Sequence, residues 1–512
     1  MTGPEAPSAP AAPAGIGDGS SHPPLRRPAL AALLLALAAG LLAPIWTVRF
    51  PLLVDYPNHL ASAFVMAHLD DAAFHFDQYY RAAWTTYPYL SMDVILLALQ
   101  HFVSIELAGR LFLSLCVLSV PAAAWFFIRR ANPGEEGLAL WSLLVCHNLY
   151  FFRFGFLNLQ LSMAICFFLL GMWLWHLERP RVATWFLLLL VATALYFTHL
   201  FGFAVAAVVM SAYCWSARRT FKQIVASLAL YLPGIFFYLH SVVGHGAKGG
   251  FHFRGLADKI GSLISVMVAC SPAVDMLTIL ALLGVLAWVQ IDNYEFKWNR
   301  PWRRVTAILF LFYWILPAVI GPATNVDKRI LPFVFVLSLA GAKVGQRGRK
   351  LAMIAVLVFF IRAGVLERNF VISQPHFARL AEAISSIPPG ARVLPLVDWA
   401  GGASWPERHF WAYGVIDRGW VTPCLFHDPG VHPFALKDDS YDPCGETITP
   451  STVLDWRRIA KEFDYVWAYH VPQFTSPLSS AGGIVFDGEN LQVFQLGIAA
   501  DRGKEDRPSP TP

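Results

Sequence analysis

The chain has 512 residues, of which 56% are hydrophobic and only 14% are charged, and its formal net charge is +5. A soluble domain carries about 25% charged residues, so this composition excludes an ordinary soluble enzyme and predicts that much of the surface faces lipid. The basic residues are spread over many loops, so nucleic acid is not an expected partner. The 18 Trp residues are typical of a protein with aromatic belts at both membrane interfaces.

The N-terminal segment lacks hydrophobic periodicity and is rich in Ala, Pro, Gly and Ser, so residues 1–28 are predicted to be a disordered cytoplasmic tail. Arg26 and Arg27 then precede an apolar run at 29–48. A cleaved signal peptide is the competing interpretation. The run is long for such a peptide, and no small-residue cleavage site follows before Arg49. We therefore expect an uncleaved first span.

Ten further apolar runs predict about eleven transmembrane helices in all, at 107–128, 137–153, 157–176, 182–198, 200–216, 223–240, 272–290, 305–321, 330–345 and 351–366. The weaker segments 90–104 and 258–270 are expected to be juxtamembrane or re-entrant, with an extra span as the alternative for either. Eleven spans with the N-terminus in the cytoplasm place at least two basic residues in every inner loop, as the positive-inside rule requires. This predicts a multi-pass protein of the plasma (inner) membrane, with a membrane domain at 29–366 and a long first outer loop at 49–106.

The C-terminal part, residues 367–499, is predicted to be a small α/β domain on the periplasmic or extracellular side, followed by a disordered tail at 500–512. Strands are expected within 391–401 and 464–471, and a helix with a Ser or Thr cap within 451–463. Two short strands are expected around an Asp-Gly turn within 482–496. The predicted fold class is therefore an all-α polytopic membrane bundle with a large first outer loop and this small domain.

Cys424 and Cys444 both lie in the C-terminal domain. On an oxidising side of the membrane they would be a disulfide candidate. The alternative is two free thiols.

The candidate catalytic residue is Asp55, which lies just beyond the first span. A partly desolvated carboxylate at a membrane surface can accept a proton from an acceptor hydroxyl, or hold a metal ion. His59 follows four residues later and would face the same way on a helix, so it is a candidate substrate-binding residue. The alternative is an ordinary hydrated loop in which Asp55 caps a helix that begins near Pro57.

Two short motifs, Val-Asp-Tyr-Pro-Asn-His-Leu-Ala from Val54 and Ala-Gly-Arg-Leu at 108–111, together with the layout of the apolar runs, resemble the C-type (GT-C) glycosyltransferase superfamily. The resemblance implies a polyprenyl-phosphate-linked sugar donor and a catalytic acid at Asp55. Many members have two acidic residues in this loop motif, whereas Tyr56 follows Asp55 here. Dependence on a divalent metal (Mg or Mn) therefore stays open, with Asp55 as its ligand if there is one.

A basic pair, Lys328 and Arg329, lies between two late spans on the predicted outer side, where cations are disfavoured. A lipid phosphate would supply the counter-charge, and Arg suits bidentate phosphate contacts. The family often has an Arg in this place. The alternative is a snorkelling pair with Asp327 as its partner.

Three further polar residues are candidates for substrate binding. Arg153 and Asn158 belong to an aromatic-rich link between two spans, where Arg153 would bind donor phosphate or sugar, or else anchor the interface. His199 follows Thr198 in a very tight turn at membrane depth, where polar residues are often functional. The alternative is a His that bonds a neighbouring backbone group.

The function that the sequence favours is transfer of a sugar from a polyprenyl-phosphate donor to a lipid-linked glycan, lipid or protein acceptor on the outer face. No phosphate-binding Gly-rich loop occurs, which excludes an ATP-driven pump. A secondary transporter or flippase is the alternative from another class, and it predicts internal repeats and buried ionisable pairs. Neither is visible in the sequence. A third possibility is a catalytically inactive GT-C-like assembly partner.

Overall fold

The computed structural model describes residues 27–497 except 85, 87, 242–249, 267, 269, 270, 292–299, 322, 399–404, 428–431, 438–442 and 446–453. Residues 1–26 and the whole of the predicted C-terminal tail lie outside the described residues.

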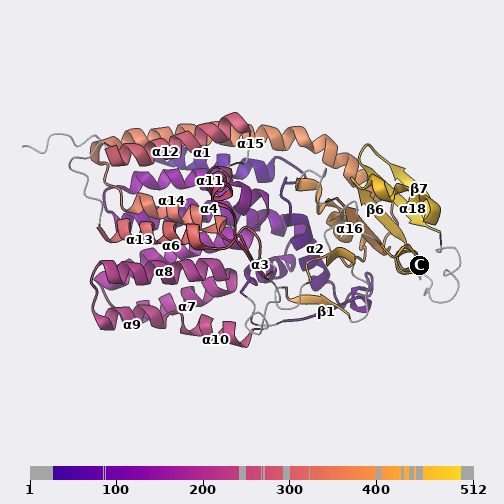
Figure 1. Ribbon diagram of the computed structural model, residues 1–512, viewed down its shortest axis with the longest axis horizontal. Helices are drawn as coiled ribbons and strands as arrows, with labels where there is room; N and C mark the ends of the chain where they lie inside the picture. The colour runs from indigo at the N-terminus through magenta and orange to yellow at the C-terminus, as the bar shows by residue number, and fades with distance from the viewer. Residues whose placement is uncertain are drawn as a thin grey trace, which may run out of the picture.

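The described residues form a helical bundle with a small sheet-containing domain at one end (Figure 1). We call the bundle end next to this domain the domain end. The bundle helices are α1 (Arg27–Trp46), α4 (Ile105–Ala131), α5 (Leu143–Cys146), α6 (Leu157–Glu178), α7 (Val182–Thr198), α8 (Leu200–Ser216), α9 (Phe221–Ala229), α10 (Leu232–His240), α12 (Pro272–Ile291), α13 (Arg300–Ile315), α14 (Leu331–Ala340) and α15 (Gly348–Ser385).

Three of the described helices, α1, α4 and α6, are long and apolar enough to cross a membrane, and the bent pair α9 and α10 would make a fourth span. Helix α6 lies at the centre, and 89% of its most apolar 18-residue stretch is buried inside the protein. Several other apolar helices are shorter than a full span. The count of eleven spans therefore stays a prediction.

The two weaker apolar segments form short helices, α3 (Ser91–Gln100) and α11 (Leu256–Ser265), of 10 residues each. At about 1.5 Å per residue, each covers only about half of a hydrocarbon core of roughly 30 Å. Neither helix is a straight span, which fits the predicted juxtamembrane or re-entrant placement.

Helix α11 presents an apolar face outward. Leu256, Ile260 and Ile264 are exposed and recur every four residues, so they share one side of the helix. Lys259 and Ser262 on the opposite side are buried in the protein. This arrangement is typical of a helix that lies in the plane of a membrane interface.

A buried ion pair joins α12 to α15. Arg362 Nη1 donates to Asp275 Oδ1 at 3.0 Å, and Arg362 Nη2 donates to the carbonyl of His147 at 3.1 Å. Both charged residues are less than 5% exposed. The chain therefore holds a buried charge pair that was not visible in the sequence. The sequence hid the pair because Asp275 stands at the first turn of one apolar run and Arg362 lies inside another.

The domain contains a four-stranded sheet of order β4-β6-β8-β7, in which only β4 and β6 run parallel. Its elements are β4 (Val393–Val397), α16 (Tyr413–Arg418), α17 (Trp456–Glu462), β6 (Tyr465–Tyr469), α18 (Thr475–Ala481), β7 (Gly482–Asp487) and β8 (Leu491–Leu496). These strands lie where the sequence predicts them. The cap of α17 differs, because Asp455 accepts hydrogen bonds from the N–H groups of Arg457 and Arg458 in place of the expected Ser or Thr.

Helix α15 carries the chain from the bundle into the domain without a break (Figure 1). It runs through residue 367, where the sequence predicts the domain to begin. The composition of the helix changes there from apolar to mixed, while its backbone hydrogen bonding continues.

The loop after α1 is joined to the C-terminal domain by strand pairing and side-chain bonds. It contains α2 (Tyr56–Ala67) and β1 (Tyr80–Ala82), and β1 pairs antiparallel with β5 (Phe434–Leu436). The Tyr80 hydroxyl accepts from the N–H of Thr422 and donates to its carbonyl, at 2.9 and 2.8 Å. A further short pair joins β2 (Phe251–His252) to β3 (Val319–Ile320). The domain thus packs on the loop that carries Asp55.

A disulfide joins Cys424 to Cys444, 20 residues apart. It closes a loop that contains β5, so the same segment is held by the disulfide at its base and by β1 along its edge.

The buried pair predicts a large stability effect. Arg362→Ala removes the Arg362–Asp275 ion pair from a buried position, which should destabilise the fold by about 3–5 kcal/mol. The matched control is Arg368→Ala, on the exposed side of the same helix, which should cost about 0.5 kcal/mol or less. Denaturant unfolding of the purified protein measures both, and similar losses in the two variants would show that the pair does not hold α12 on α15.

A candidate active site at the domain end of the bundle

Asp55 lies in the turn between α1 and α2, held by the link that precedes α6. The Val54 N–H donates to the Arg153 carbonyl at 2.9 Å, and the Asp55 N–H donates to the Phe154 carbonyl at 3.1 Å. Asp55 occupies the N-cap position of α2, but its side chain makes no capping hydrogen bond. The carboxylate is therefore not used as a helix cap.

Gly155 allows this close approach. Its φ of +92° lies in the left-handed region, and a Cβ there would stand 3.0 Å from the Asp55 Cβ. Only glycine combines this backbone conformation with the contact.

The Asp55 carboxyl group is shielded from water and sits in a positive field. Its side chain is 19% exposed. Burial raises its pKa from 3.8 to about 7, against the opposing fields of Arg408 and Arg329. A carboxyl group that titrates near neutrality is suited to accept a proton. It is also a candidate functional group on physical grounds.

The buried amide of Asn58 joins α2 to the C-terminal domain. Its Nδ2 donates to the Cys424 carbonyl at 3.1 Å, and its Oδ1 accepts from the Phe426 N–H at 2.9 Å. Nδ2 also lies 3.3 Å from His409 Nδ1. On its other side, His409 Nε2 lies 3.7 Å from Asp55 Oδ1.

His59 faces an aromatic group from the same domain segment. Its ring centroid lies 5.0 Å from that of Phe426 and 6.0 Å from that of His432. Burial lowers the His59 pKa to about 4, so the ring is neutral at physiological pH. These three rings form a wall near Asp55.

Arg329 and His199 converge on the same region from other segments. Arg329 Nη1 lies 3.4 Å from His199 Nε2, and its guanidinium stacks 4.6 Å above the Phe156 ring. His199 Nδ1 accepts from the Phe201 N–H at 3.0 Å, so the ring carries its proton on Nε2. Two N–H donors therefore lie next to each other, an arrangement that favours an anionic oxygen within reach of both.

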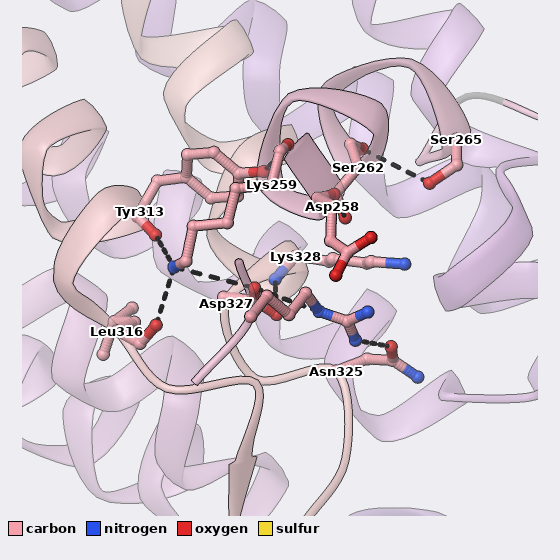
Figure 2. Close-up of polar contacts among 10 residues, drawn as sticks. Asp258, Lys259, Ser262, Ser265, Tyr313, Leu316, Asn325, Asp327 and Lys328 are labelled. Atoms are coloured by element: carbon pink, nitrogen blue, oxygen red, sulfur yellow. Dashed lines mark hydrogen bonds and ion pairs between the residues drawn. The ribbon is translucent and has the colours of Figure 1, made fainter. Parts of the chain in front are cut away.

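The neighbouring carboxylate, Asp327, is fully buried, and Figure 2 shows it beside Lys259. Its Oδ2 lies 3.2 Å from Arg254 Nε and 3.7 Å from Lys259 Nζ. Lys259 also donates to the carbonyls of Tyr313 and Leu316, at 2.7 and 2.8 Å. Asp327 is thus neutralised by two cations from the chain around α11, and the snorkelling alternative does not describe Arg329.

The other predicted residues have varied surroundings. The Lys328 side chain is buried, and the backbone N–H of Lys328 donates to Asp327 Oδ1 at 3.0 Å. Asn158 holds the first outer loop, accepting from the Met92 N–H at 3.0 Å and donating to the Tyr89 carbonyl at 2.8 Å. Its amide is engaged by backbone, whereas Asp55, His59, His199 and Arg329 surround the site.

Arg153 lines a mainly apolar cavity of about 390 Å³, and its carbonyl holds the backbone next to Asp55. The remaining lining comes from α11, α12 and the link between them: Ile264, Val268, Ser271, Pro272, Asp275, Met276 and Ile279.

Within the part of the chain that the structure describes, no group of three His, Cys, Asp or Glu side chains could hold a metal ion. Whether Asp55 binds a divalent metal stays a prediction.

Asn58, Arg408 and His409 were missed by the sequence analysis. Asn58 stands inside the motif that contains Asp55, but a polar residue on a predicted helix carries no signal by itself. His409 lies 351 residues from Asn58, in a domain whose docking no periodicity reveals.

Comparison with known proteins supports the fold. No protein-family profile and no curated protein sequence matches the chain. Among solved structures, it is similar to ArnT from Cupriavidus metallidurans in the apo state, a protein of the GT-C family. The identity is 13% and the TM-score 0.55, over 91% of this chain and 98% of that one. The predicted GT-C-like fold is confirmed, and together with the apolar helices it indicates an integral membrane protein.

The raised pKa of Asp55 predicts a cost in stability. The unfolded chain ionises Asp55 near pH 3.8 and the folded one near pH 7, so stability falls as pH rises between these values and stays lower above them. Asp55→Asn should then stabilise the protein above pH 7 by up to about 4 kcal/mol, because one pKa unit equals about 1.4 kcal/mol. Below pH 4 the gain should vanish.

Unfolding midpoints of both proteins between pH 4 and pH 9 measure this difference. The control is Asp71→Asn in the same loop, because the Ala73 N–H and His68 lower the Asp71 pKa and its neutralisation should bring no gain. A pH-independent effect of Asp55→Asn would contradict the prediction.

Proposed function

We propose that the chain is a membrane glycosyltransferase that moves a sugar from a polyprenyl-phosphate-linked donor to an acceptor hydroxyl. The observation that carries the proposal is the shielded Asp55 carboxyl group, which titrates near pH 7 in the field of Arg329 and Arg408. The N-terminus would be cytoplasmic. The domain end would then lie at the outer face of the plasma (inner) membrane.

In the proposed reaction Asp55 removes the proton from the acceptor hydroxyl as the oxygen attacks the anomeric carbon of the donor sugar. The bond from that carbon to the phosphate oxygen breaks, and polyprenyl phosphate leaves with the bonding electrons. The proton remains on Asp55. General-base catalysis of this kind typically contributes about 10²–10⁴-fold in rate.

Arg329 and His199 would bind the donor phosphate. Their donor nitrogens, Arg329 Nη1 and His199 Nε2, lie 3.4 Å apart. Both would donate to one phosphate oxygen beside them and would stabilise the charge that grows on the leaving group. Lys328, buried beside them, would add to the positive field. Since Asp327 is already paired with Arg254 and Lys259, it does not compete for Arg329.

The cavity beside Arg153 supports a lipid-linked donor. Its walls are largely apolar, and α11 turns an apolar face outward next to it. A polyprenyl chain would approach along this helix with its phosphate toward the arginines.

The acceptor would reach Asp55 past the rings of His59, Phe426 and His432, which the C-terminal domain helps to assemble. A lipid-linked glycan, a lipid or a protein would each present a suitable hydroxyl.

A lipid or solute transporter is the second candidate, and one observation favours it. The buried pair of Asp275 and Arg362 is the kind of group that transporters use, and Asp275 lines the same cavity as Arg153. The two functions separate by variant: transfer requires Asp55, whereas transport would require the Asp275–Arg362 pair and would tolerate Asp55→Asn.

Transfer itself is tested with purified protein in nanodiscs, supplied with polyprenyl-phosphate hexoses and pentoses and a membrane lipid extract as acceptor. Release of polyprenyl phosphate is the readout. Asp55→Asn should lower the rate by about 10²–10⁴-fold, whereas Asp71→Asn should keep it. Equal rates in wild type and Asp55→Asn would refute the assigned role of Asp55.

Donor binding predicts a separate result. Polyprenyl phosphate should raise the unfolding midpoint of the wild-type protein, because a ligand that binds only the folded state stabilises it. Polyprenol, which lacks the phosphate, should raise the midpoint less. Arg329→Gln should remove the difference between the two lipids, and Arg368→Gln should retain it. Retention of the difference in Arg329→Gln would place the phosphate elsewhere.

A further inference from the structure

The contacts of Asn58 fix the orientation of its side-chain amide. Oδ1 accepts from the Phe426 N–H, and Nδ2 donates to the Cys424 carbonyl. A backbone N–H only donates and a carbonyl only accepts, so exchanging the oxygen and nitrogen of the amide would break both bonds. The group that faces His409 is therefore the donor, Nδ2.

That orientation determines which nitrogen of His409 carries the proton. Asn58 Nδ2 lies 3.3 Å from His409 Nδ1, so Nδ1 must accept. In a neutral imidazole the other nitrogen is then protonated. His409 is 5% exposed, which favours the neutral ring. The protonated nitrogen is consequently Nε2, which lies 3.7 Å from Asp55 Oδ1.

We infer that His409 is a positioning residue for the base: it presents an Nε2–H to one oxygen of Asp55, in a tautomer that Asn58 locks, and leaves the other oxygen for the acceptor. This role rests on the proposed function of Asp55. The 3.7 Å separation is longer than a hydrogen bond, and such contacts in ligand-free sites tighten when substrate binds.

The locked tautomer ties the site to the C-terminal domain. Asn58 is held by the backbone on either side of Leu425, and Cys424 at one end of that segment is bonded to Cys444. By fixing the Asn58 amide, the domain thus determines that His409 carries its proton on Nε2, the nitrogen nearer Asp55.

Three charged or titratable groups act on Asp55 and His409: Arg408, Arg329 and His59. Arg408 and Arg329 act on Asp55 and lower its pKa, against burial. Burial, His59 and Arg408 all lower the pKa of His409, so its ring stays neutral while Asp55 titrates. Loss of the Nε2–H should therefore appear as a further rise in the Asp55 pKa.

The experiment measures the protonation of Asp55 directly and needs no sugar donor. N,N′-dicyclohexylcarbodiimide reacts with protonated carboxyl groups in apolar surroundings, and mass spectrometry of the full-length protein in nanodiscs gives the pH midpoint of Asp55 labelling. His409→Phe should shift the midpoint upward by up to about one unit, because the Nε2–H at 3.7 Å favours the ionised carboxyl group less strongly than a full hydrogen bond to a charged group would. His409→Gln, whose amide nitrogen falls near Nε2, should retain the wild-type midpoint.

The matched control is His68→Phe, which removes a histidine that pairs with Asp71 in the same loop, 3.4 Å away. It should leave the Asp55 midpoint in place. An unchanged or lowered midpoint in His409→Phe, or equal shifts in His409→Phe and His409→Gln, would overturn the inference. Labelling does not depend on turnover, so failure of the transfer assay would leave this result readable.

A second measurement needs only the wild-type chain and an assignment variant. In protein labelled with ¹⁵N-histidine, the resonances lost in His409→Gln should be those of a ring protonated at Nε2 and unprotonated at Nδ1. A ring protonated at Nδ1 would overturn the inference even if the Phe variant does not fold.

Discussion

A buried carboxylate in an apolar bundle needs cationic partners, and Asp327 forms ion pairs with Arg254 and Lys259. Leaving such a charge unpaired would cost several kcal/mol. The pairing orders the turn between α13 and α14 and draws α11 against it. Lys259 also donates to the carbonyls of Tyr313, in the last turn of α13, and Leu316, just after it, where helix carbonyls have no partners within the helix. Arg329, two residues after Asp327, is thereby turned toward His199 and Phe156.

The site is assembled from segments that are remote in sequence. The turn before α2 supplies Asp55, the link before α6 supplies its backbone partners, and the α7–α8 turn supplies His199. The domain supplies Arg408 and His409. Each contribution is short and lies at an element end, where backbone groups and side chains are free to face a common space. A bundle of apolar helices provides few polar groups, so the ends of its helices carry the chemistry.

The sequence predicted the parts of this site that interrupt apolar runs. Asp55, His199 and Arg329 are noticeable because a polar residue beside an apolar span is energetically costly and therefore a functional candidate. Asn58 and His409 do not stand out, since polar residues are ordinary on a loop helix and in a soluble domain. Helix α15 shows the same limit in the fold: its change of composition near residue 367 resembles a domain boundary, although the helix continues to Ser385. The Asp275–Arg362 pair was hidden because pairing depends on which helices become neighbours.

The pairing of β1 with β5 and the Asn58 contacts also have a consequence for the synthesis of the protein. Ribosomes synthesise about 5–20 residues per second, and His409, which contacts Asn58, is synthesised 351 residues after it. The loop after α1 therefore spends tens of seconds with the edge of β1 and the buried face of α2 uncovered. Biogenesis of this chain must protect that loop until the last quarter of the sequence arrives. A chain truncated before residue 409 would insert its helices yet leave the loop permanently unfinished.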